Sequence, residues 1–194
     1  GVVIGLFASM GIILLRVFLR RGIESPEQLE EVGINVYASV PISETLKEKN
    51  RKTGVRSKQE TRTLLATENP ADLAIEAIRG LRTSLHFAMM EAKNNILMIS
   101  GASPNAGKTF IGSNLAAIIS QTGQKVLFID ADMRKGYVHK LFNSSQTKGL
   151  SDYLSGKNDI ESLICKVPGE EFNYIGRGEV PPNPAELLMH PQLS

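Results

Sequence analysis

Residues 102–109 form a phosphate-binding motif in the middle of the chain. They read Ala-Ser-Pro-Asn-Ala-Gly-Lys-Thr directly after Gly101, which matches the pattern G-x-x-x-x-G-K-[S/T] except for an alanine at the first position. Gly107 leaves room for backbone amides to close around a phosphate, Lys108 can bridge the β- and γ-phosphates, and the Thr109 hydroxyl can bind Mg²⁺. We therefore predict a loop that binds ATP and Mg²⁺. The residues expected to contact the nucleotide are Ser103, Pro104, Asn105, Ala106, Gly107, Lys108, Thr109 and Phe110.

Two carboxylates follow the next apolar run of the chain. Residues 126–130 are apolar up to Asp130, and Asp132 stands two positions further on. Ligand sites of parallel sheets open at the carboxyl ends of the strands, so we expect both carboxylates at the same crevice as Lys108. A pair of this kind can hold Mg²⁺ or accept a proton from an incoming hydroxyl, and the spacing leaves open which of the two is the base. The predicted catalytic set is Lys108, Asp130 and Asp132, and the predicted metal set is Thr109, Asp130 and Asp132.

The surrounding residues predict the elements that position these groups. Residues 96–100 are a continuous apolar run, as expected for a buried parallel strand. A helix is predicted over 107–122, and a second buried strand over 126–130. This order is a βαβ unit, so we predict an α/β fold with a P-loop NTPase-type parallel sheet flanked by helices. Such a sheet needs more strands than the two or three that we can place, and we expect the domain to be incomplete.

A helix is also predicted before the first strand. Asn69 is its expected cap and Pro70 its first residue. Its apolar stripe is Ala74, Ile78, Leu81, Leu85 and Ala88. On the opposite side, Glu76, Arg79 and Arg82 fall within an arc of about 120°. From the residues alone, this charged face is either solvated surface or a contact between subunits.

The start of the chain is its most hydrophobic part. Residues 1–15 carry no charged side chain, and three arginines follow by position 21. A helix over residues 1–19 would be about 29 Å long, close to the ~30 Å hydrocarbon thickness of a membrane. Arginines at its trailing end place that end in the cytoplasm. We predict a transmembrane helix over 1–21, with a buried core helix as the alternative, and residues after about 20 in the cytoplasm.

The segment between this helix and residue 69 is mostly polar. A short helix is predicted over 25–32 and a brief strand over 34–41. Residues 43–63 hold seven Lys or Arg and three Glu, which favours a solvated linker, or else a basic stretch on anionic lipid.

Composition excludes several classes of function. Hydrophobic residues make up 42% and charged residues 22% of the chain, which is typical of a globular protein and not of a disordered one. The formal net charge of +2 gives no basis for a nucleic-acid partner. Cys165 is the only cysteine, so an internal disulfide and any zinc site with two cysteines are excluded.

Three of these stretches resemble the bacterial tyrosine kinases (BY-kinases) of polysaccharide export, and in particular their Wzc-like members. Residues 100–109 are similar to the family's Walker A loop, including the internal Pro104. Residues 126–134, VLFIDADMR, match its Walker A′ pattern. The spacing from Glu76 to Arg82 matches its E-x-x-R-x-x-R oligomerisation signature. The apolar helix upstream and residues 180–188 also fit, so the resemblance extends over essentially the whole chain.

The resemblance implies an ATP-dependent protein-tyrosine kinase of the bacterial inner membrane that phosphorylates neighbouring copies of itself. It implies a role in polymerisation and export of capsule or exopolysaccharide, a homo-oligomer joined through Glu76, Arg79 and Arg82, and as partners a phosphotyrosine phosphatase and the polysaccharide export and polymerisation proteins. The expected domains are a transmembrane helix (1–21), a juxtamembrane segment with a linker (22–68) and a P-loop kinase domain truncated at its C-terminal end (69–194).

Tyr137 is the tyrosine nearest to the aspartate pair in the sequence, and similar kinases carry a regulatory tyrosine in this region. Our hypothesis is that unmodified Tyr137 obstructs the site and that its phosphate turns toward an arginine, with Arg177 as the candidate. A tyrosine that only packs beneath a loop is the alternative.

Two elements of the family are missing. After residue 135 there is no aliphatic run that ends in the aspartate of a Walker B motif, and there is no C-terminal tyrosine cluster. The chain starts with Gly1, so we expect it to be a piece of a longer protein that need not be active by itself. Two other functions stay open. A ParA- or MinD-type ATPase would carry a signature lysine where this chain has Ser103, and a non-catalytic polysaccharide chain-length regulator would not need Lys108.

Overall fold

The smaller of two compact units has helical residues at 9–12 and a short helix at 27–30 within its described part. A computed structural model of the chain describes residues 5, 7, 9–12, 15, 25–52 and 64–189, and the chain divides into Gly1–Ser39 and Val40–Ser194. In the first unit, α2 covers Glu27–Glu30, which confirms the short helix predicted there. The strand predicted over 34–41 is wrong, because no described segment pairs with it.

The predicted transmembrane helix over 1–21 falls largely outside the described residues. Within the described part of the chain, no helix has both the length and the apolar character that crossing a membrane requires. The membrane segment therefore remains a prediction.

The second unit is built on a mixed three-stranded sheet of order β1-β3-β2. Strand β1 (Leu127–Ile129) runs parallel to β3 (Asn173–Ile175). Strand β2 (Cys165–Lys166) pairs with β3 in the antiparallel direction. The α/β prediction and the strand at 126–130 are confirmed, but the sheet is not entirely parallel. A short return between β2 and β3 permits only a hairpin, whereas a parallel pair needs a long crossover.

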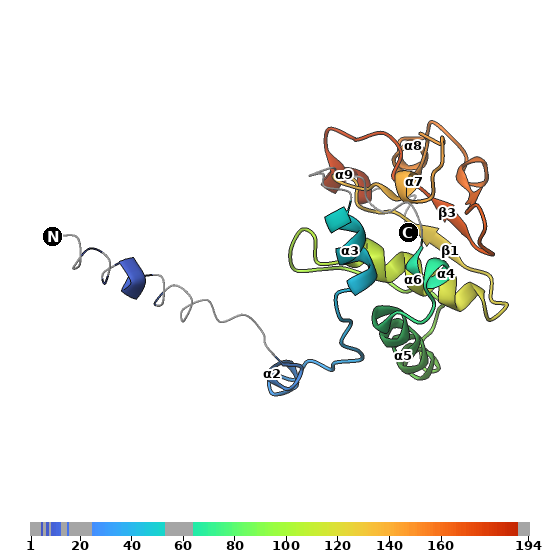
Figure 1. Ribbon diagram of the computed structural model, residues 1–194. Helices are drawn as coiled ribbons and strands as arrows, with labels where there is room; N and C mark the ends of the chain where they lie inside the picture. Colours follow the sequence, from blue (N-terminus) through green and yellow to red (C-terminus); the bar gives the residue numbers. More distant parts are fainter. Residues whose placement is uncertain are drawn as a thin grey trace. The chain divides into compact units, whose positions relative to one another are not determined.

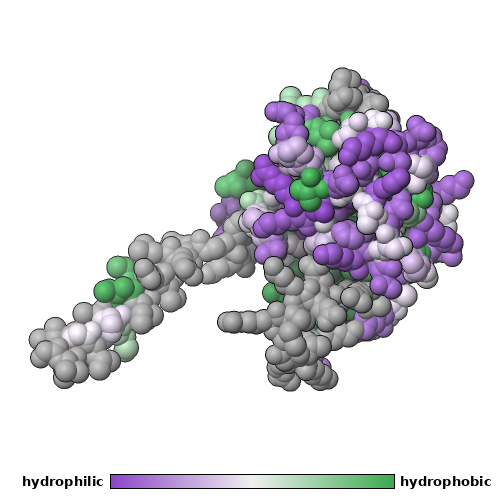
Figure 2. Space-filling model, turned by 90° about the horizontal axis from the view of Figure 1, so that it is seen from above, coloured by the Kyte–Doolittle hydropathy of each residue, from purple (hydrophilic) through white to green (hydrophobic). Residues whose placement is uncertain are grey.

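Helix α6 (Lys108–Ser120) is the central helix of this unit. It packs against β1, against α5 (Leu73–Met89) and against α4 (Leu65–Glu68), as Figure 1 shows. The other elements of the unit are α3 (Glu44–Lys52), α7 (Val138–Leu141), α8 (Leu150–Leu154), the 3-10 helix η1 (Ile160–Leu163) and α9 (Pro184–Leu188). On the face seen in Figure 2, hydrophilic side chains predominate and apolar ones are scattered among them. The main apolar core lies inside, where α6 meets α4, α5 and the sheet.

Residues 96–100 do not form the buried strand predicted for them. They have no strand pairing with any described segment, and the side chains of Ile96 and Met98 are 80% and 85% exposed. Ile99 lies near α6, since a Cβ added to Gly112 of α6 would lie 3.3 Å from Ile99 Cδ1 and 3.0 Å from Phe128 Cε2. The apolar run thus lies along α6 beside β1 without the backbone hydrogen bonds that define a strand.

The linker predicted over 43–63 is helical in its first part. Residues 44–52 form α3, while residues 53–63 lie outside the described part. Ser43 Oγ accepts a hydrogen bond from Leu46 N at 3.3 Å, and Leu46 packs against the core. The prediction considered charge alone, whereas the capping serine and one apolar contact stabilise the helix.

Asp72, and not Asn69, caps α5. Its carboxylate accepts hydrogen bonds from Ala74 N at 2.9 Å, from Ser43 Oγ at 2.6 Å and from Thr45 Oγ1 at 2.9 Å. The start predicted for the helix is therefore a few residues early. The predicted stripe is confirmed at Ala74 and Ile78, which are fully buried, but its last member, Ala88, is exposed.

The Asp72 contacts predict a pH-dependent contribution to stability. Burial alone would raise the pKa of Asp72, but the three donors together lower it below its ordinary value. Asp72→Ala should reduce the free energy of unfolding by about 2 kcal/mol at pH 7. A depressed folded-state pKa stabilises only while the carboxylate is charged, so the difference should shrink as the pH falls through that pKa. Thermal unfolding at a series of pH values from 7 down to about 2 measures it.

The matched control is Glu44→Ala, which removes an exposed carboxylate that forms an ion pair with Lys47 in the same helix. This change should cost less than about 0.5 kcal/mol. Equal losses for the two variants at pH 7 would contradict a capping role of Asp72.

Candidate active site

The phosphate loop has the backbone conformation that its glycine predicts. Gly107 is the N-cap of α6 with φ 85°, in the left-handed region, and Asn105 also has a positive φ of 64°. No protein atom lies within 4 Å of the position that a Cβ of Gly107 would occupy. Conformation, and not crowding by the protein, therefore requires glycine here.

Lys108 is the first residue of α6 and folds back toward the start of the loop. A Cβ added to Gly101 would lie 3.1 Å from Lys108 Cγ and 3.2 Å from Ala106 Cβ. The stretch Ser103–Ala106 is exposed, and the N-terminus of a 13-residue helix provides positive potential beside it. This combination of exposed amides, helix terminus and lysine can bind a phosphate group.

Phe110 plays a different part from the other predicted contact residues. Its side chain packs against the apolar core, and its carbonyl accepts a hydrogen bond from Asn114 Nδ2 at 2.8 Å. The side chain and the carbonyl of Phe110 therefore already have partners within the protein.

Asp130 is buried at the end of β1. Its amide donates to Ile175 O at 2.9 Å, so the pairing with β3 continues to this residue. The side chain, 6% exposed, accepts hydrogen bonds from Asp132 N at 3.1 Å and from Val138 N at 3.3 Å. Burial raises the pKa of Asp130, while the two amides and the charge of Arg177 partly oppose this. The carboxylate thus holds the whole turn after β1 in place.

Asp132 is exposed and organises the same turn from outside. Its Oδ1 accepts hydrogen bonds from Lys135 N at 2.8 Å and from Arg134 N at 3.2 Å, and its carbonyl accepts from Gly136 N at 2.8 Å. Gly136 is confined between the two aspartates, since an added Cβ would lie 2.6 Å from Asp130 Oδ2 and 2.7 Å from Asp132 O. Of the pair, Asp132 is the one that solvent and a ligand can reach.

The predicted metal residues carry the oxygen donors that Mg²⁺ prefers, because this ion is commonly bound by one or two carboxylates and keeps several waters. Among the described residues, however, there is no group of three His, Cys, Asp or Glu side chains that could hold a metal ion. In the same part of the chain, no hydrogen bond or ion pair links Lys108 or Thr109 to Asp130 or Asp132. The phosphate loop and the aspartate turn are related through α6 and β1, which pack together.

Tyr137 and Arg177 both border Asp130. Tyr137 is half-buried at the N-cap of α7, directly before Val138, whose amide donates to Asp130. Arg177 follows β3, two residues beyond Ile175, which accepts the Asp130 amide. No sequence pattern singles out His139, but in the structure its imidazole lies close enough to Asp130 and Arg177 to feel their charges. Burial and the charges of Lys140 and Arg177 lower the pKa of His139, while Asp130 opposes them.

The predicted oligomerisation residues are on α5. Glu76 and Arg79 form an ion pair with each other, and Arg79 Nη1 also donates to Pro70 O at 2.8 Å. Arg79 and Arg82 are half-buried and Glu76 is exposed. Within one chain, Glu76 therefore already has a cationic partner, and a contact between copies would have to exchange or extend this pair.

Solved structures with this fold decide the family. The chain matches the kinase domain of the Escherichia coli tyrosine kinase ETK with a TM-score of 0.80 and 56% sequence identity, over 89% of this chain and 67% of that one. It matches the BceF tyrosine kinase domain with a TM-score of 0.78 and 38% identity, over 89% and 69% of the two chains. This chain belongs to the family of bacterial tyrosine kinases.

Curated relatives agree with this membership. A protein from Klebsiella pneumoniae, named as a tyrosine-protein kinase in the cps region, is 64% identical over the whole chain, and the tyrosine-protein kinase etk of Escherichia coli K12 is 55% identical. The chain spans 27% and 28% of the lengths of these two relatives. No protein-family model matches the chain. The resemblance read from the sequence to Wzc-like BY-kinases is confirmed.

The packing of Gly136 gives a test of the aspartate turn. Gly136→Ala should lower the free energy of unfolding by about 1–3 kcal/mol, because the new Cβ meets backbone and a buried carboxylate that cannot both move away. The measurement is denaturant unfolding of the chain.

Gly80→Ala is the matched control for this change. An added Cβ at Gly80 meets no atom within 4 Å, and alanine in a helix is favoured over glycine by about 1 kcal/mol, so this variant should be more stable than the parent. A neutral or stabilising effect of Gly136→Ala would show that the turn can rearrange.

Proposed function

We propose that this chain is part of an ATP-dependent protein-tyrosine kinase of the bacterial inner membrane, which phosphorylates tyrosines on neighbouring copies and regulates the polymerisation and export of capsule or exopolysaccharide. The observation that carries the proposal is a phosphate loop with Gly107 in its left-handed conformation and Lys108 at the start of α6, in a chain that belongs to a family of tyrosine kinases. Membership supports the activity, and the loop provides its nucleotide site.

The chemistry that these residues support is in-line phosphoryl transfer from ATP. The tyrosine oxygen attacks the γ-phosphorus, the bond to the β–γ bridging oxygen breaks, and the hydroxyl proton passes to a carboxylate. Lys108 and the loop amides stabilise the charge on the phosphates. Thr109, Asp130 and Asp132 are the residues that would hold Mg²⁺, which neutralises phosphate charge when bound. Asp132 is the better candidate to meet a metal or a hydroxyl, because Asp130 is buried and accepts two backbone hydrogen bonds.

The tyrosines of the chain differ in burial, and therefore in how readily they could accept a phosphate. Tyr174 is 1% exposed and packs edge-on against Phe142, and burial raises the pKa of its hydroxyl. A phosphate cannot be added there without opening the core. Tyr137 and Tyr153 are half-buried and Tyr37 is 49% exposed, so these three are more accessible to a second copy.

Assembly and partners belong to the same proposal. The charged residues of α5, Glu76, Arg79 and Arg82, would join copies of the chain and bring the tyrosine of one to the site of the next. A transmembrane helix over 1–21 would hold the copies at the membrane. A phosphotyrosine phosphatase and the polysaccharide export and polymerisation proteins are the further partners that the family resemblance supports.

Incubation of the full-length protein with γ-labelled ATP tests the activity. We expect label on tyrosine, and Lys108→Met should reduce it by about a hundredfold because phosphate charge is no longer balanced. Lys125→Met, an exposed lysine before β1, is the control and should leave the labelling unchanged. Release of phosphate without labelled tyrosine would indicate a ParA- or MinD-type ATPase, and neither product would indicate a chain-length regulator without catalysis.

Replacement of Tyr137 tests the regulatory proposal. Tyr137→Phe should leave the initial rate of phosphorylation near that of the parent and abolish the later rise in rate, by about tenfold, that phosphorylation of Tyr137 produces. Arg177→Gln should abolish the same rise, since the phosphate loses its cationic partner. Tyr153→Phe is the control, and a rise that persists in Tyr137→Phe would contradict the proposal.

A further inference from the structure

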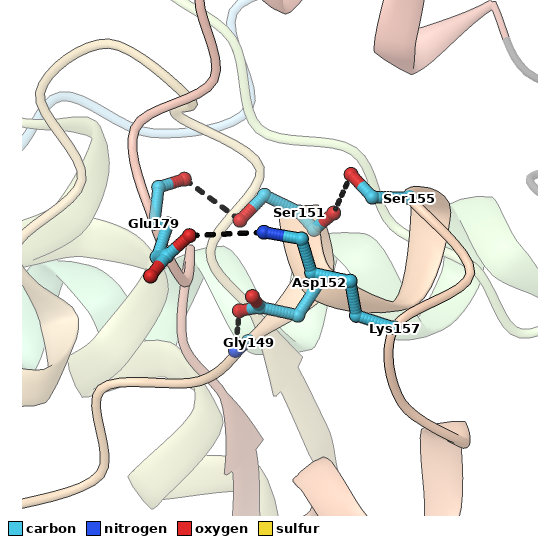
Figure 3. Close-up of polar contacts among 6 residues, drawn as sticks. All are labelled: Gly149, Ser151, Asp152, Ser155, Lys157 and Glu179. Carbon is cyan, nitrogen blue, oxygen red and sulfur yellow. Dashed lines mark hydrogen bonds and ion pairs between the residues drawn. The ribbon is translucent and has the colours of Figure 1, made fainter.

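The loop that carries Arg177 is fastened to the start of α8 by backbone and side-chain hydrogen bonds. Leu150 N donates to Gly176 O and Ser151 N donates to Arg177 O, both at 2.8 Å. Ser151 Oγ donates to Glu179 O at 2.7 Å, as drawn in Figure 3. We call the two paired segments, residues 149–152 and 176–179, the glycine clasp. Three carbonyls of the loop after β3 therefore accept hydrogen bonds from the start of α8: those of Gly176, Arg177 and Glu179.

The α8 side of the clasp is itself fixed by a buried carboxylate. Asp152 Oδ2 accepts a hydrogen bond from Gly149 N at 2.8 Å, and Asp152 and Ser151 are only 4% and 3% exposed. At the exposed edge of the clasp, Lys157 Nζ forms an ion pair with Glu179 Oε2 at 3.1 Å. Buried hydrogen bonds of this kind are costly to break, whereas the exposed ion pair contributes little.

Two glycines make the close approach of the segments possible. A Cβ at Gly149 would lie 2.1 Å from Gly176 O and 2.4 Å from Gly178 N. Gly178 has φ +86°, and a Cβ there would lie 2.5 Å from both Asp152 Oδ2 and Ser151 Oγ. No other residue fits at either position, so the spacing of the two backbones is set within narrow limits.

Arg177 is the charged residue between Gly176 and Gly178. Its carbonyl accepts from Ser151 N, and its Nε donates to Gly178 O at 3.2 Å, so the clasp limits both its backbone and the direction of its side chain. Ile175, two residues before Arg177, accepts a hydrogen bond from Asp130 N at 2.9 Å. This bond brings the loop after β3 next to the aspartate turn.

We propose that Ser151 and Asp152 are positioning residues for the phosphotransfer site, which act by holding Arg177 beside Asp130 through the glycine clasp. The inference rests on the proposed function, in which Arg177 receives the phosphate of Tyr137. It adds two residues, far from the phosphate loop in sequence, on which the activated state depends. The Arg177 guanidinium can bind the phosphate of Tyr137 only if the loop after β3 keeps its position.

The test compares Ser151→Ala and Asp152→Asn with Ser155→Ala. Ser155 Oγ, at the C-cap of α8, donates to Ser151 O at 2.7 Å and forms no hydrogen bond or ion pair with residues 176–179, so it is the matched control. The first readout is the ¹⁵N NMR signal of Arg177 Nε in the full-length protein without ATP, assigned by its loss in Arg177→Gln. Its proton should exchange with water about tenfold faster in Ser151→Ala and Asp152→Asn, and at the parent rate in Ser155→Ala.

The second readout is the rate of tyrosine phosphorylation after activation. Ser151→Ala should lower kcat about fivefold with KM for ATP unchanged, and should have no further effect in an Arg177→Gln background. Additive losses in the double variant, or an unchanged Arg177 signal in Ser151→Ala, would overturn the proposal. If Asp152→Asn does not fold, Ser151→Ala gives the same information. Absence of tyrosine phosphorylation in the unaltered protein would contradict the proposed function instead, because the NMR signal reports on the clasp without any activity.

Discussion

The buried carboxylate of Asp130 is the interaction on which the rest of the site depends. A charge placed at the end of a strand with 6% exposure must find donors, and it finds them in the amides of Asp132 and Val138. These two bonds close the turn after β1 and leave space only for glycine at position 136. They also fix the start of α7, and with it Tyr137. The buried carboxylate of Asp130 thus positions Asp132 and Tyr137 at this end of the sheet. Through the pairing of β1 with β3, Arg177 lies at the same end.

Helix α6 connects this corner to the nucleotide loop and to the rest of the unit. Gly107 allows the helix to begin at Lys108, and Gly112 allows it to approach Phe128 of β1. Asn114 binds in two directions, accepting from Ala66 N at 2.8 Å and donating to Phe110 O at 2.8 Å. Through α4, a segment that precedes the phosphate loop in sequence is therefore tied to the helix that presents it.

Local features of the structure could be predicted from the sequence, and non-local ones could not. The phosphate loop, α6, β1 and the apolar stripe of α5 depend on motifs and periodicity within a few residues. The strand predicted over 96–100 failed because strand formation needs a partner elsewhere in the chain. The hydrogen bond from Leu150 N to Gly176 O joins residues 26 positions apart by their numbers, and it left no local pattern at all. Asp72 was overlooked as a cap because its other donors, Ser43 and Thr45, stand in a segment whose charge suggested a linker.

We infer that the phosphate loop and the aspartate turn form one nucleotide site, although no hydrogen bond or ion pair joins them in the described part of the chain. Hydrogen–deuterium exchange with and without ADP and Mg²⁺ tests it in a single experiment. We expect slower exchange of amides in two separate stretches, 103–110 and 130–138, with the second effect lost when Mg²⁺ is omitted. Protection confined to 103–110, with the aspartate turn unchanged, would contradict it.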